Sequence, residues 1–276
     1  MAALLILAGL FIAGALAPVI APGGANKIDL AARWRNHPPT LAGGHLLGTD
    51  NVGHDILVRT LYGIHTSEQS ALLAALLATL LGVAMGCLAG YAGGWLDAFL
   101  MRTADLVVAF PALMVLYAAW VFSEPVTIRK ATFIFGFYLW TSVARAVRAA
   151  FVSLRNVEFV QAAQAAGASS VRIVWRHILP NAAGAVLVAA SAVVGLVLML
   201  EATVEFFGLG VSSVVQPSLG NLIGDAAGSG IGTYNELGLG WWVWASPAFA
   251  LVAIIVCVNL VGDGLDMALN PGATRR

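Results

Sequence analysis

The sequence predicts an all-α, polytopic membrane protein with about six transmembrane helices. Of its 276 residues, 60% are hydrophobic and only 10% are charged, and the mean hydropathy is +0.88. Several apolar runs approach or exceed about 18 residues, the length that a helix needs to cross the hydrocarbon core of a bilayer. These runs are continuous and do not alternate with polar residues, as the strands of a membrane β-barrel do.

Six apolar runs are long enough to be membrane spans if some of the helices are tilted. Ala15-Leu16-Ala17 in the first run resembles the cleavage site of a signal peptide, but the basic residues that precede a signal peptide are missing. We therefore interpret this run as a membrane span. Pro111 and Pro247 are predicted to kink the third and sixth spans. The six runs cover residues 3–20, 70–92, 104–122, 131–148, 182–204 and 241–262.

Two longer segments separate the runs and divide the chain. A polar segment rich in Gly, Pro, His and Asn follows the first run, and a Gly-rich segment separates the fifth run from the sixth. We therefore predict a first part, residues 1–69, made of one transmembrane helix and a long extracytoplasmic loop. The second part, residues 70–276, is predicted to be a core domain with a cytoplasmic loop at 153–180.

Arginine sets the predicted orientation, in which both termini are cytoplasmic. Cytoplasmic segments close to span ends are enriched in Lys and Arg. Of the six basic residues on the outer side, four lie in the one long loop, and Arg129 and Lys130 are exceptions to the rule. The arginines placed inside are Arg102, Arg145, Arg148, Arg155, Arg172, Arg176, Arg275 and Arg276.

Polar side chains interrupt the apolar pattern between the fourth and fifth runs, from Val157 to Asn181. If residues 155–177 crossed the membrane, four charged side chains would each cost about 2.5–3.5 kcal/mol near the bilayer centre, or roughly 10 kcal/mol together. They are Arg155, Glu158, Arg172 and Arg176. The segment is therefore predicted to lie outside the hydrocarbon, on the cytoplasmic side.

The same segment is predicted to fold as a helix, a tight turn and a second helix. Alanine and glutamine dominate residues 160–166 and favour a helix, Gly167 interrupts it, and Ala168-Ser169-Ser170 can cap the next one. The second helix is predicted to place its apolar side chains on one face; they are Val171, Val174, Trp175 and Ile178. Two interpretations stay open: a helix lying on the membrane surface, or an element that docks a cytoplasmic partner.

The spacing within this segment resembles the EAA loop of ABC importer permeases. Gln161-Ala162-Ala163, Gly167 and Ile178-Leu179-Pro180 stand at the family spacing, with Gln161 where the family usually has Glu. In that family the loop contacts the ATPase subunit. The resemblance therefore implies an ATPase-coupling set made of Glu158, Gln161, Ala162, Ala163, Gly167, Ile178, Leu179 and Pro180.

Further stretches resemble the C-type subunit of the dipeptide/oligopeptide/nickel permeases. "HLLGTDNVGHDILVRTLYGIHTS" from His45 to Ser67 is similar to a stretch of that subunit, although His54 and His65 stand where Arg is usual. Three later stretches match in the same order: "AGYAGGWLDAFLMRTADLVVAFP", "EATVEFFGLGV" and "NLVGDGLDMALNP". The resemblance thus covers most of the chain.

This resemblance implies a type I ABC importer permease fold and a multi-pass location in the bacterial cytoplasmic membrane. It implies the transmembrane subunit of an ATP-driven importer of dipeptides or oligopeptides. The expected partners are a B-type permease subunit, two cytoplasmic ABC ATPase domains, an extracytoplasmic solute-binding protein and the lipid bilayer. A nickel or nickel-chelate permease is the alternative within the class, and a secondary transporter working without an ATPase is the alternative outside it.

No catalytic or cofactor site is predicted in this chain. A P-loop requires the pattern Gly-x-x-x-x-Gly-Lys-Ser/Thr, and neither Lys27 nor Lys130, the only lysines, lies in it. ATP and Mg²⁺ are therefore expected on the partner ATPase subunits, and this chain is not expected to be an enzyme. The five histidines show no metal-site spacing, and a formal net charge of zero gives no indication of nucleic-acid binding.

Other residues have candidate roles within the spans. Glu201 and Glu205, at the outer end of the fifth span, are candidates for the substrate path because carboxylates in membrane helices are often functional. Small residues repeated every four positions in the second span permit close helix packing, within the chain or against a second subunit; they are Gly82, Gly86 and Gly90. Arg102 and Asp105, three residues apart, are predicted to form an ion pair.

Overall fold

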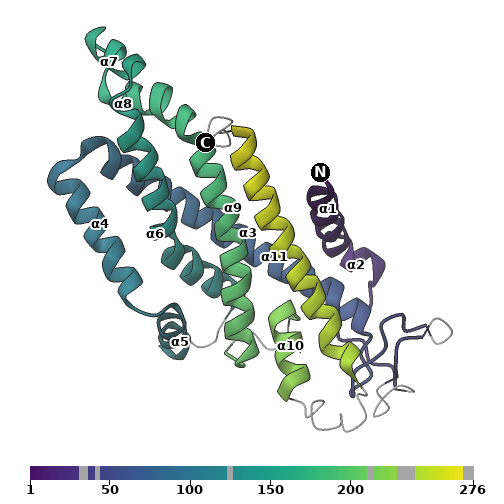
Figure 1. The fold of residues 1–276 in the computed structure, drawn as a ribbon. Helices are drawn as coiled ribbons and strands as arrows, with labels where there is room; N and C mark the ends of the chain where they lie inside the picture. The colour runs from purple at the N-terminus through teal and green to yellow at the C-terminus, as the bar shows by residue number, and fades with distance from the viewer. Residues whose placement is uncertain are drawn as a thin grey trace. The chain divides into compact units, whose positions relative to one another are not determined.

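The computed structural model describes residues 1–30, 37–40, 44–122, 127–209, 214, 216–228 and 240–269, and its described elements are helices (Figure 1). Within these residues, β-bridge pairing is limited to two isolated bridges, Ile28 with His54 and Thr49 with Asp55. Arg275 and Arg276, which contributed to the predicted orientation, lie outside the described residues. The helices are α1 (Ala2–Ala15), α2 (Ala17–Ile20), α3 (Ile56–Ala92), α4 (Gly94–Ala109), α5 (Ala112–Phe122), α6 (Ile128–Leu154), α7 (Glu158–Ala165), α8 (Ser170–Ile173), the π-helix η1 (Val174–Ile178), α9 (Leu179–Phe206), α10 (Leu219–Gly228) and α11 (Trp241–Leu269).

Three stretches of helix in the described chain are long and apolar enough to cross a membrane, judged by length and composition. They are Ile56–Ala92, the continuous run Ser170–Phe206, and Trp241–Leu269. Ala2–Ala15 is a shorter apolar helix. The all-α, polytopic fold class is therefore confirmed, while the number of six spans stays a prediction.

Helix α3 begins at Ile56 and not near residue 70, where the apolar run starts. Its 37 residues extend about 55 Å at 1.5 Å per residue, well beyond a hydrocarbon core of about 30 Å. Arg59, His65 and Glu68 lie in its first turns, so the apolar pattern marked only the later part of the helix. Residues 56–69 of the predicted loop are thus helical.

The predicted span at 104–122 is two helices, α4 and α5, and the expectation of one kinked helix is wrong. Phe110 takes an extended conformation (φ −87°, ψ 129°) directly before Pro111, as steric contact with a following proline ring favours. The hydroxyl of Tyr138 donates to the carbonyl oxygen of Phe110 at 3.0 Å, which satisfies an acceptor freed by the break. Pro247, in contrast, lies inside the continuous helix α11.

The chain divides into two compact units, and unit 2 comprises residues 72–116, 132–196 and 258–276. Within it, α3 and α6 pack closely along Gly82, Gly86 and Gly90. A Cβ atom added at these glycines would lie 2.5 Å from Cβ of Val143, 2.6 Å from the carbonyl oxygen of Ala144 and 2.5 Å from Cβ of Phe151, respectively. Glycine at the three positions therefore lets the backbones of two helices of the same chain approach each other.

Two ion pairs link α6 to α4 within unit 2. Arg145 pairs with Asp105 at 2.9 Å, and the guanidinium of Arg148 donates to both carboxylate oxygens of Asp97, one of them at 2.6 Å. Among the described residues the predicted pair between Arg102 and Asp105 is not formed. Asp105 finds its cation on the neighbouring helix, a tertiary contact that sequence spacing does not reveal.

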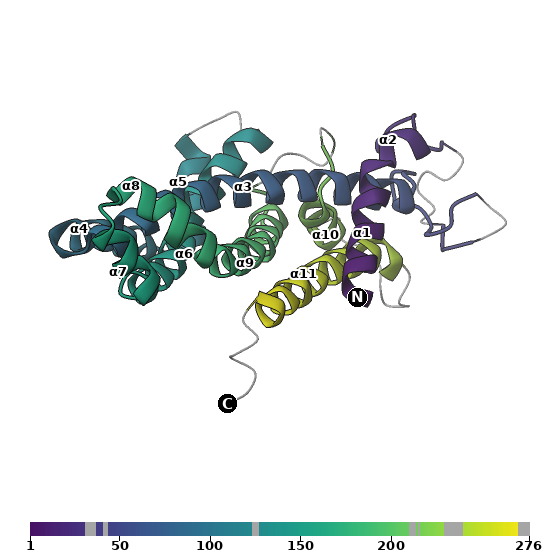
Figure 2. The same cartoon turned by 90° about the horizontal axis from the view of Figure 1, so that it is seen from above.

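Unit 1 comprises residues 1–71, 117–131 and 197–257. Here α1 crosses the beginning of α3 (Figure 2), and a Cβ atom at Gly14 would lie 2.7 Å from Cγ2 of Ile64. The Gly-rich segment after α9 contains α10, which the sequence did not predict. A Cβ atom at Gly220 would lie 2.5 Å from Cα of Ala202, so α10 packs tightly against the end of α9.

Candidate functional site

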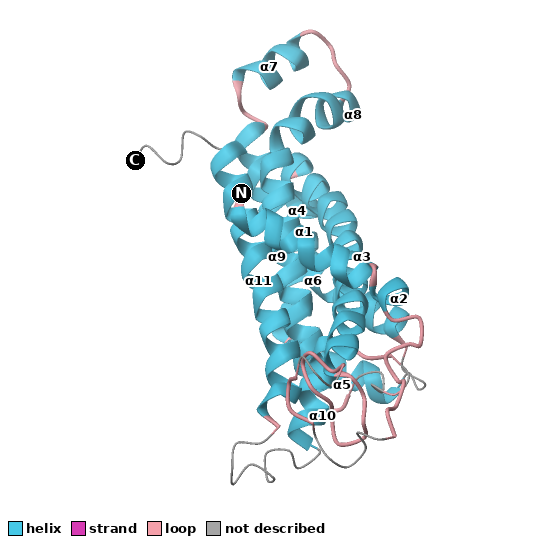
Figure 3. Cartoon of the chain, turned by 90° about the vertical axis from the view of Figure 1, so that its right-hand side faces the viewer, coloured by secondary structure: helices cyan, strands magenta, loops and turns pink. Residues whose placement is uncertain are grey.

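A helix–turn–helix element forms in unit 2 between α6 and α9, and α7 and α8 pack against each other in it (Figure 3). The turn is closed by a hydrogen bond from the N–H of Ala168 to the carbonyl oxygen of Ala163 at 3.0 Å, and from Gly167 to Gln164 at 2.9 Å. Gly167 itself has a φ of 78°. This is the left-handed ending that glycine favours at a helix C-terminus.

The space around Gly167 is open. A Cβ atom added there would meet no heavy atom within 4 Å, so a larger side chain would not crowd the turn. A β-branched side chain would instead strain the backbone, because a left-handed conformation brings Cβ close to neighbouring backbone atoms. The role of Gly167 is therefore conformational and not a matter of space.

The second half of the element begins at Ser169, whose hydroxyl oxygen accepts from the N–H of Arg172 at 3.4 Å. The predicted single apolar face is divided: Ile178 is buried, as is Ile173, whereas Val171 and Trp175 are 68% and 66% exposed. The π-helix η1 lies between α8 and α9 and changes the angular spacing of the side chains. Regular helical periodicity could not predict this division.

The EAA-type positions are mostly on the surface. Glu158, Gln161, Ala162, Gly167 and Pro180 are exposed, Ala163 and Leu179 are half-buried and Ile178 is buried. The side-chain amide of Gln161 donates to the carbonyl oxygen of Asn156 at 3.0 Å, which a carboxylate could not do. Four apolar side chains are also exposed on the element, and we call them its apolar face: Val157, Phe159, Val171 and Trp175.

A second polar centre, in unit 1, is built around Asp50. One carboxylate oxygen accepts the backbone N–H groups of Val52, Gly53 and His54 at 2.8–2.9 Å. The other oxygen contacts Nδ1 of His54 at 2.8 Å and Nη1 of Arg59 at 3.0 Å. Burial raises the pKa of Asp50, but the hydrogen bonds from His54 and the charge of Arg59 outweigh it and leave the pKa below its ordinary value.

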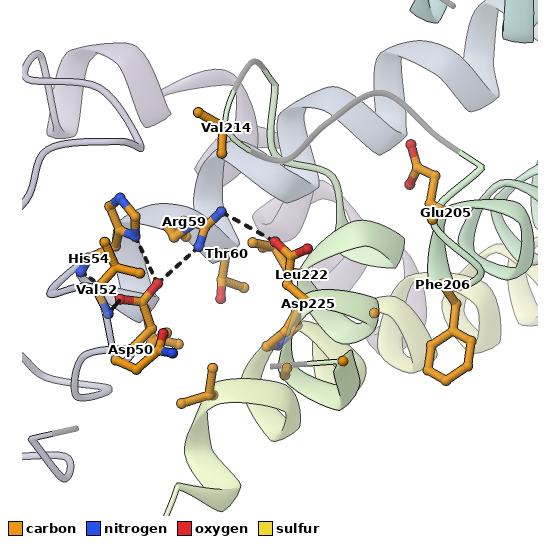
Figure 4. Close-up of a pocket in the computed structure, with 18 of the residues that line it drawn as sticks. Asp50, Val52, His54, Arg59, Thr60, Glu205, Phe206, Val214, Leu222 and Asp225 are labelled. Atoms are coloured by element: carbon orange, nitrogen blue, oxygen red, sulfur yellow. Dashed lines mark hydrogen bonds and ion pairs between the residues drawn. The ribbon is translucent and has the colours of Figure 1, made fainter. Parts of the chain in front are cut away.

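Arg59 and Asp50 line a cavity of about 610 Å³ in unit 1 (Figure 4). Arg59 is 6% exposed, and its Nη2 lies 3.8 Å from Asp225 of α10. Glu205, Phe206, Leu222 and Val243 are also among the lining residues. The cavity therefore combines charged groups from the beginning of α3, from the end of α9 and from α10.

Both predicted path residues are buried in unit 1, at 4% exposure for Glu201 and 7% for Glu205. The carboxylate of Glu205 accepts from the hydroxyl of Ser218, and Glu201 hydrogen bonds to Ser70. Glu205 lines the cavity, whereas Glu201 is not one of its lining residues. The structure thus brings one of the two candidates to a site.

Histidine in the long loop has structural partners. His45 lies between two carboxylates, with Nδ1 2.8 Å from Asp55 and Nε2 3.2 Å from Asp29. The hydrogen bond to Asp55 raises the pKa of His45, burial lowers it, and the contact with Asp29 raises it further, so that the pKa lies above its ordinary value. Within the described part of the chain, no group of His, Cys, Asp and Glu side chains could hold a metal ion.

Sequence reasoning did not single out Asp50, Arg59 or Asp225 for a role. A signal for the first was present, since Asp50 precedes Gly53 in "TDNVGHD", and Asp with a nearby Gly is typical of a turn closed by the carboxylate. Arg59 and Asp225 come together only through the packing of α10, so no pattern in the sequence links them.

Comparison with known proteins identifies the family. Residues 82–275 match the model of the "Binding-protein-dependent transport system inner membrane component" family. The oligopeptide transport system permease protein OppC of Escherichia coli K12 is 37% identical over 97% of this chain and 84% of its own. OppC of Mycobacterium bovis is 34% identical over 99% of this chain and 89% of its own.

Solved structures agree at the level of the fold. An inward-facing structure of the MetNI methionine ABC transporter has a TM-score of 0.60 and 18% identity, covering 75% of this chain and 94% of that one. The resemblance expected from the EAA-type spacing and from the C-type stretches is confirmed by these matches. The chain therefore belongs to the family of inner membrane components of binding-protein-dependent transport systems.

Proposed function

We propose that this chain is the C-type transmembrane subunit of an ATP-driven importer of oligopeptides or dipeptides in the bacterial cytoplasmic membrane. Its relatives in Escherichia coli and Mycobacterium bovis carry the name oligopeptide transport system permease and match over nearly its whole length. The partners would be a B-type permease subunit, two ABC ATPase domains and a solute-binding protein. ATP and Mg²⁺ would bind to the ATPase domains and not to this chain.

The observation that carries the coupling role is the exposed helix–turn–helix element of residues 158–180. Val160, Ile173 and Ile178 are buried, and α7, α8 and η1 contact one another. Its apolar face remains exposed beside small alanines, and a partner's groove could cover it. An exposed apolar patch with a polar rim is typical of an interaction surface.

The mechanism follows from this arrangement. ATP binding would close the ATPase pair, and the element seated in one ATPase would transmit that movement to the transmembrane helices. The hydrogen bonds that close the turn at Gly167 join α7 to α8, so the element would move as a body. Coupling of this kind requires two discrete states of the whole transporter, and ATP must bind the ATPase domains with different affinity in the two states.

Gly167 provides the test. In the complete transporter reconstituted in liposomes, Gly167→Val should reduce peptide-stimulated ATP hydrolysis and peptide uptake, because valine strains the left-handed turn. Gly167→Asn is the matched control, since asparagine tolerates that conformation far better, and it should retain most of both activities. Membrane insertion should be equal in all three proteins. Wild-type uptake and ATPase association in Gly167→Val would refute the coupling role and favour a helix that lies on the membrane surface.

The orientation is tested separately by labelling single cysteines in a background without Cys87 and Cys257. Leu30 and Ser170 are exposed positions before α3 and at the start of α8. Leu30→Cys should react with a membrane-impermeant maleimide from outside the cell, and Ser170→Cys only after the membrane is opened. Labelling of both from the same side would contradict the predicted cytoplasmic position of the element.

A further inference from the structure

A polar pocket of about 660 Å³ lies in unit 2, where α3 and α6 end and α7 begins. Its lining contains one guanidinium and three side-chain amides but no carboxylate. The pocket therefore carries a positive charge and favours an anion. Its lining residues come from the last two positions of α3, from the two positions after α6 and from α7, and they are Tyr91, Ala92, Arg155, Asn156, Gln161 and Gln164.

Arg155 is half-buried and can still donate hydrogen bonds. In the described part of the chain its guanidinium forms one hydrogen bond, from Nη1 to the carbonyl oxygen of Gly90 at 3.3 Å, and no ion pair. Both carboxylate oxygens of Asp97, on α4, accept from Arg148 instead. Nε and Nη2 of Arg155 share one edge of the planar guanidinium, and such an edge can bind two oxygen atoms of a phosphate.

The pocket is at the level where an apolar helix ends. α3 is long and apolar enough to cross a membrane, and Tyr91 and Ala92 are its last two residues. Three residues later, in the first turn of α4, Trp95 is 79% exposed. Tyr and Trp are enriched at the boundary between hydrocarbon and water, and Arg155 belongs to the predicted cytoplasmic side. We therefore expect the pocket among the head groups of the cytoplasmic leaflet, where every phospholipid carries a phosphate.

The side of α7 that lines the pocket differs from the side that carries its apolar residue. Phe159 precedes Gln161 by two residues and Gln164 by five, which corresponds to about 200° and 140° around the helix axis. An ATPase that covers Phe159 would therefore leave Gln161 and Gln164 on another side of the helix, beside the ends of α3 and α6.

We propose that this pocket binds the phosphate group of an anionic phospholipid, with Arg155 as the cation and the amides of Asn156 and Gln164 as further donors. Basic pockets on the cytoplasmic side of membrane helices bind such head groups. The ligand is separate from any transported peptide, so the inference does not depend on the proposed function.

The test is the reactivity of Gln164→Cys with the neutral reagent N-ethylmaleimide, in a background without Cys87 and Cys257. The complete transporter is compared in nanodiscs of phosphatidylcholine, in nanodiscs that also contain phosphatidylglycerol, and in phosphatidylcholine with added inorganic phosphate. Phosphatidylglycerol should slow the reaction about fivefold or more, as expected for one guanidinium near an anionic surface. Ser170→Cys, an exposed position of α8 outside the pocket, is the matched control and should react at nearly the same rate throughout.

Variants separate recognition of the lipid from folding. Arg155→Gln should abolish the effect of phosphatidylglycerol on Gln164→Cys, whereas Arg155→Lys should keep most of it, because lysine binds phosphate as a point charge. Arg172→Gln removes an exposed arginine of α8 outside the pocket and should leave the effect unchanged. An unaltered rate at Ser170→Cys in each variant shows that the element still folds.

Equal rates at Gln164→Cys in the two lipids would overturn the inference, and so would protection that persists in Arg155→Gln. Protection of the same extent by inorganic phosphate would identify free phosphate as the ligand and overturn the lipid site. A Gln164→Cys that is unreactive in every lipid would mean that the ATPase covers the pocket, which also contradicts the proposal.

Discussion

Gly86→Ala tests the close contact between α3 and α6. The added Cβ atom would lie 2.6 Å from the carbonyl oxygen of Ala144 and 2.8 Å from Cβ of Val147, whereas heavy atoms in favourable contact are about 3.5–4.0 Å apart. The carbonyl oxygen is backbone and cannot move by changing a rotamer. The two helices would therefore have to separate by about 1 Å, and overpacking of this kind costs about 1–3 kcal/mol.

The matched control is Gly264→Ala in α11, where a Cβ atom would meet nothing within 4 Å. Both changes replace glycine by alanine inside a helix, so the gain in helix propensity of about 1 kcal/mol cancels in the comparison. Gly86→Ala should therefore be less stable than Gly264→Ala by about 1–3 kcal/mol. Unfolding of the purified subunit in mixed micelles with increasing SDS, followed by far-UV circular dichroism, measures the difference.

Equal stability of the two variants would refute this reasoning. It would mean that the two helices separate without loss of stability, and that the glycines do not determine the packing distance between α3 and α6. A lower stability that appears only when the partner permease is present would refute it as well, because the glycines would then serve a contact between subunits.

Three further predictions follow from charged and polar contacts. The raised pKa of His45 means that its bridge to Asp29 and Asp55 is fully formed below the ordinary histidine pKa of about 6.5 and is lost as the pH rises through the folded-state pKa. Hydrogen exchange at residues 28–30, corrected for intrinsic rates, should therefore accelerate at alkaline pH. If His45→Gln shows the same pH dependence as the wild type, this reasoning is contradicted. Gln161→Glu should release the side chain from Asn156 and lower stability by less than about 1 kcal/mol, the value of one exposed hydrogen bond. If a basic group of the ATPase faces this position, more ATPase should co-purify with the variant at low salt. Co-purification that does not depend on salt would indicate a neutral partner surface. Asp97→Asn removes the charge that Arg148 contacts with two nitrogens. It should lower stability by about 1 kcal/mol relative to Asp263→Asn, at an exposed position of α11, in the same SDS titration. Equal stability of the two variants would show that this ion pair does not stabilise the fold.

The long apolar helices were predictable because continuous apolar sequence has few alternatives in a bilayer. The runs at 70–92, 182–204 and 241–262 all lie within α3, α9 and α11. The turn at Gly167 was predictable for a related reason, since a glycine between two helix-forming segments is a strong local signal. In both cases the decisive information lies within a few turns of the chain.

The features that sequence did not predict depend on tertiary contacts. Helix α10 carries three glycines, which lower its intrinsic propensity, and it is stabilised by packing that requires Gly220 and Gly224 to approach the backbone of α9. The partner of Asp105 is Arg145, forty residues away in the sequence. Arg59 meets Asp225 only because α10 folds back toward α3, so the cavity could not be predicted from local patterns.

The π-helix η1 makes the orientation of the helix–turn–helix element depend on how many residues the element contains. A π-turn closes through an i to i+5 hydrogen bond, seen here from the N–H of Leu179 to the carbonyl oxygen of Val174, and it therefore contains one residue more than an α-turn. Removing a single residue between Val174 and Ile178 would leave an uninterrupted α-helix to Phe206. Each residue of an α-helix advances by about 100°, so everything before the deletion would rotate by that angle about the axis of α9. The direction in which the apolar face points therefore depends on the number of residues in η1 as well as on their types. Deleting one residue there would turn the apolar face by about 100° although all of its side chains are still present.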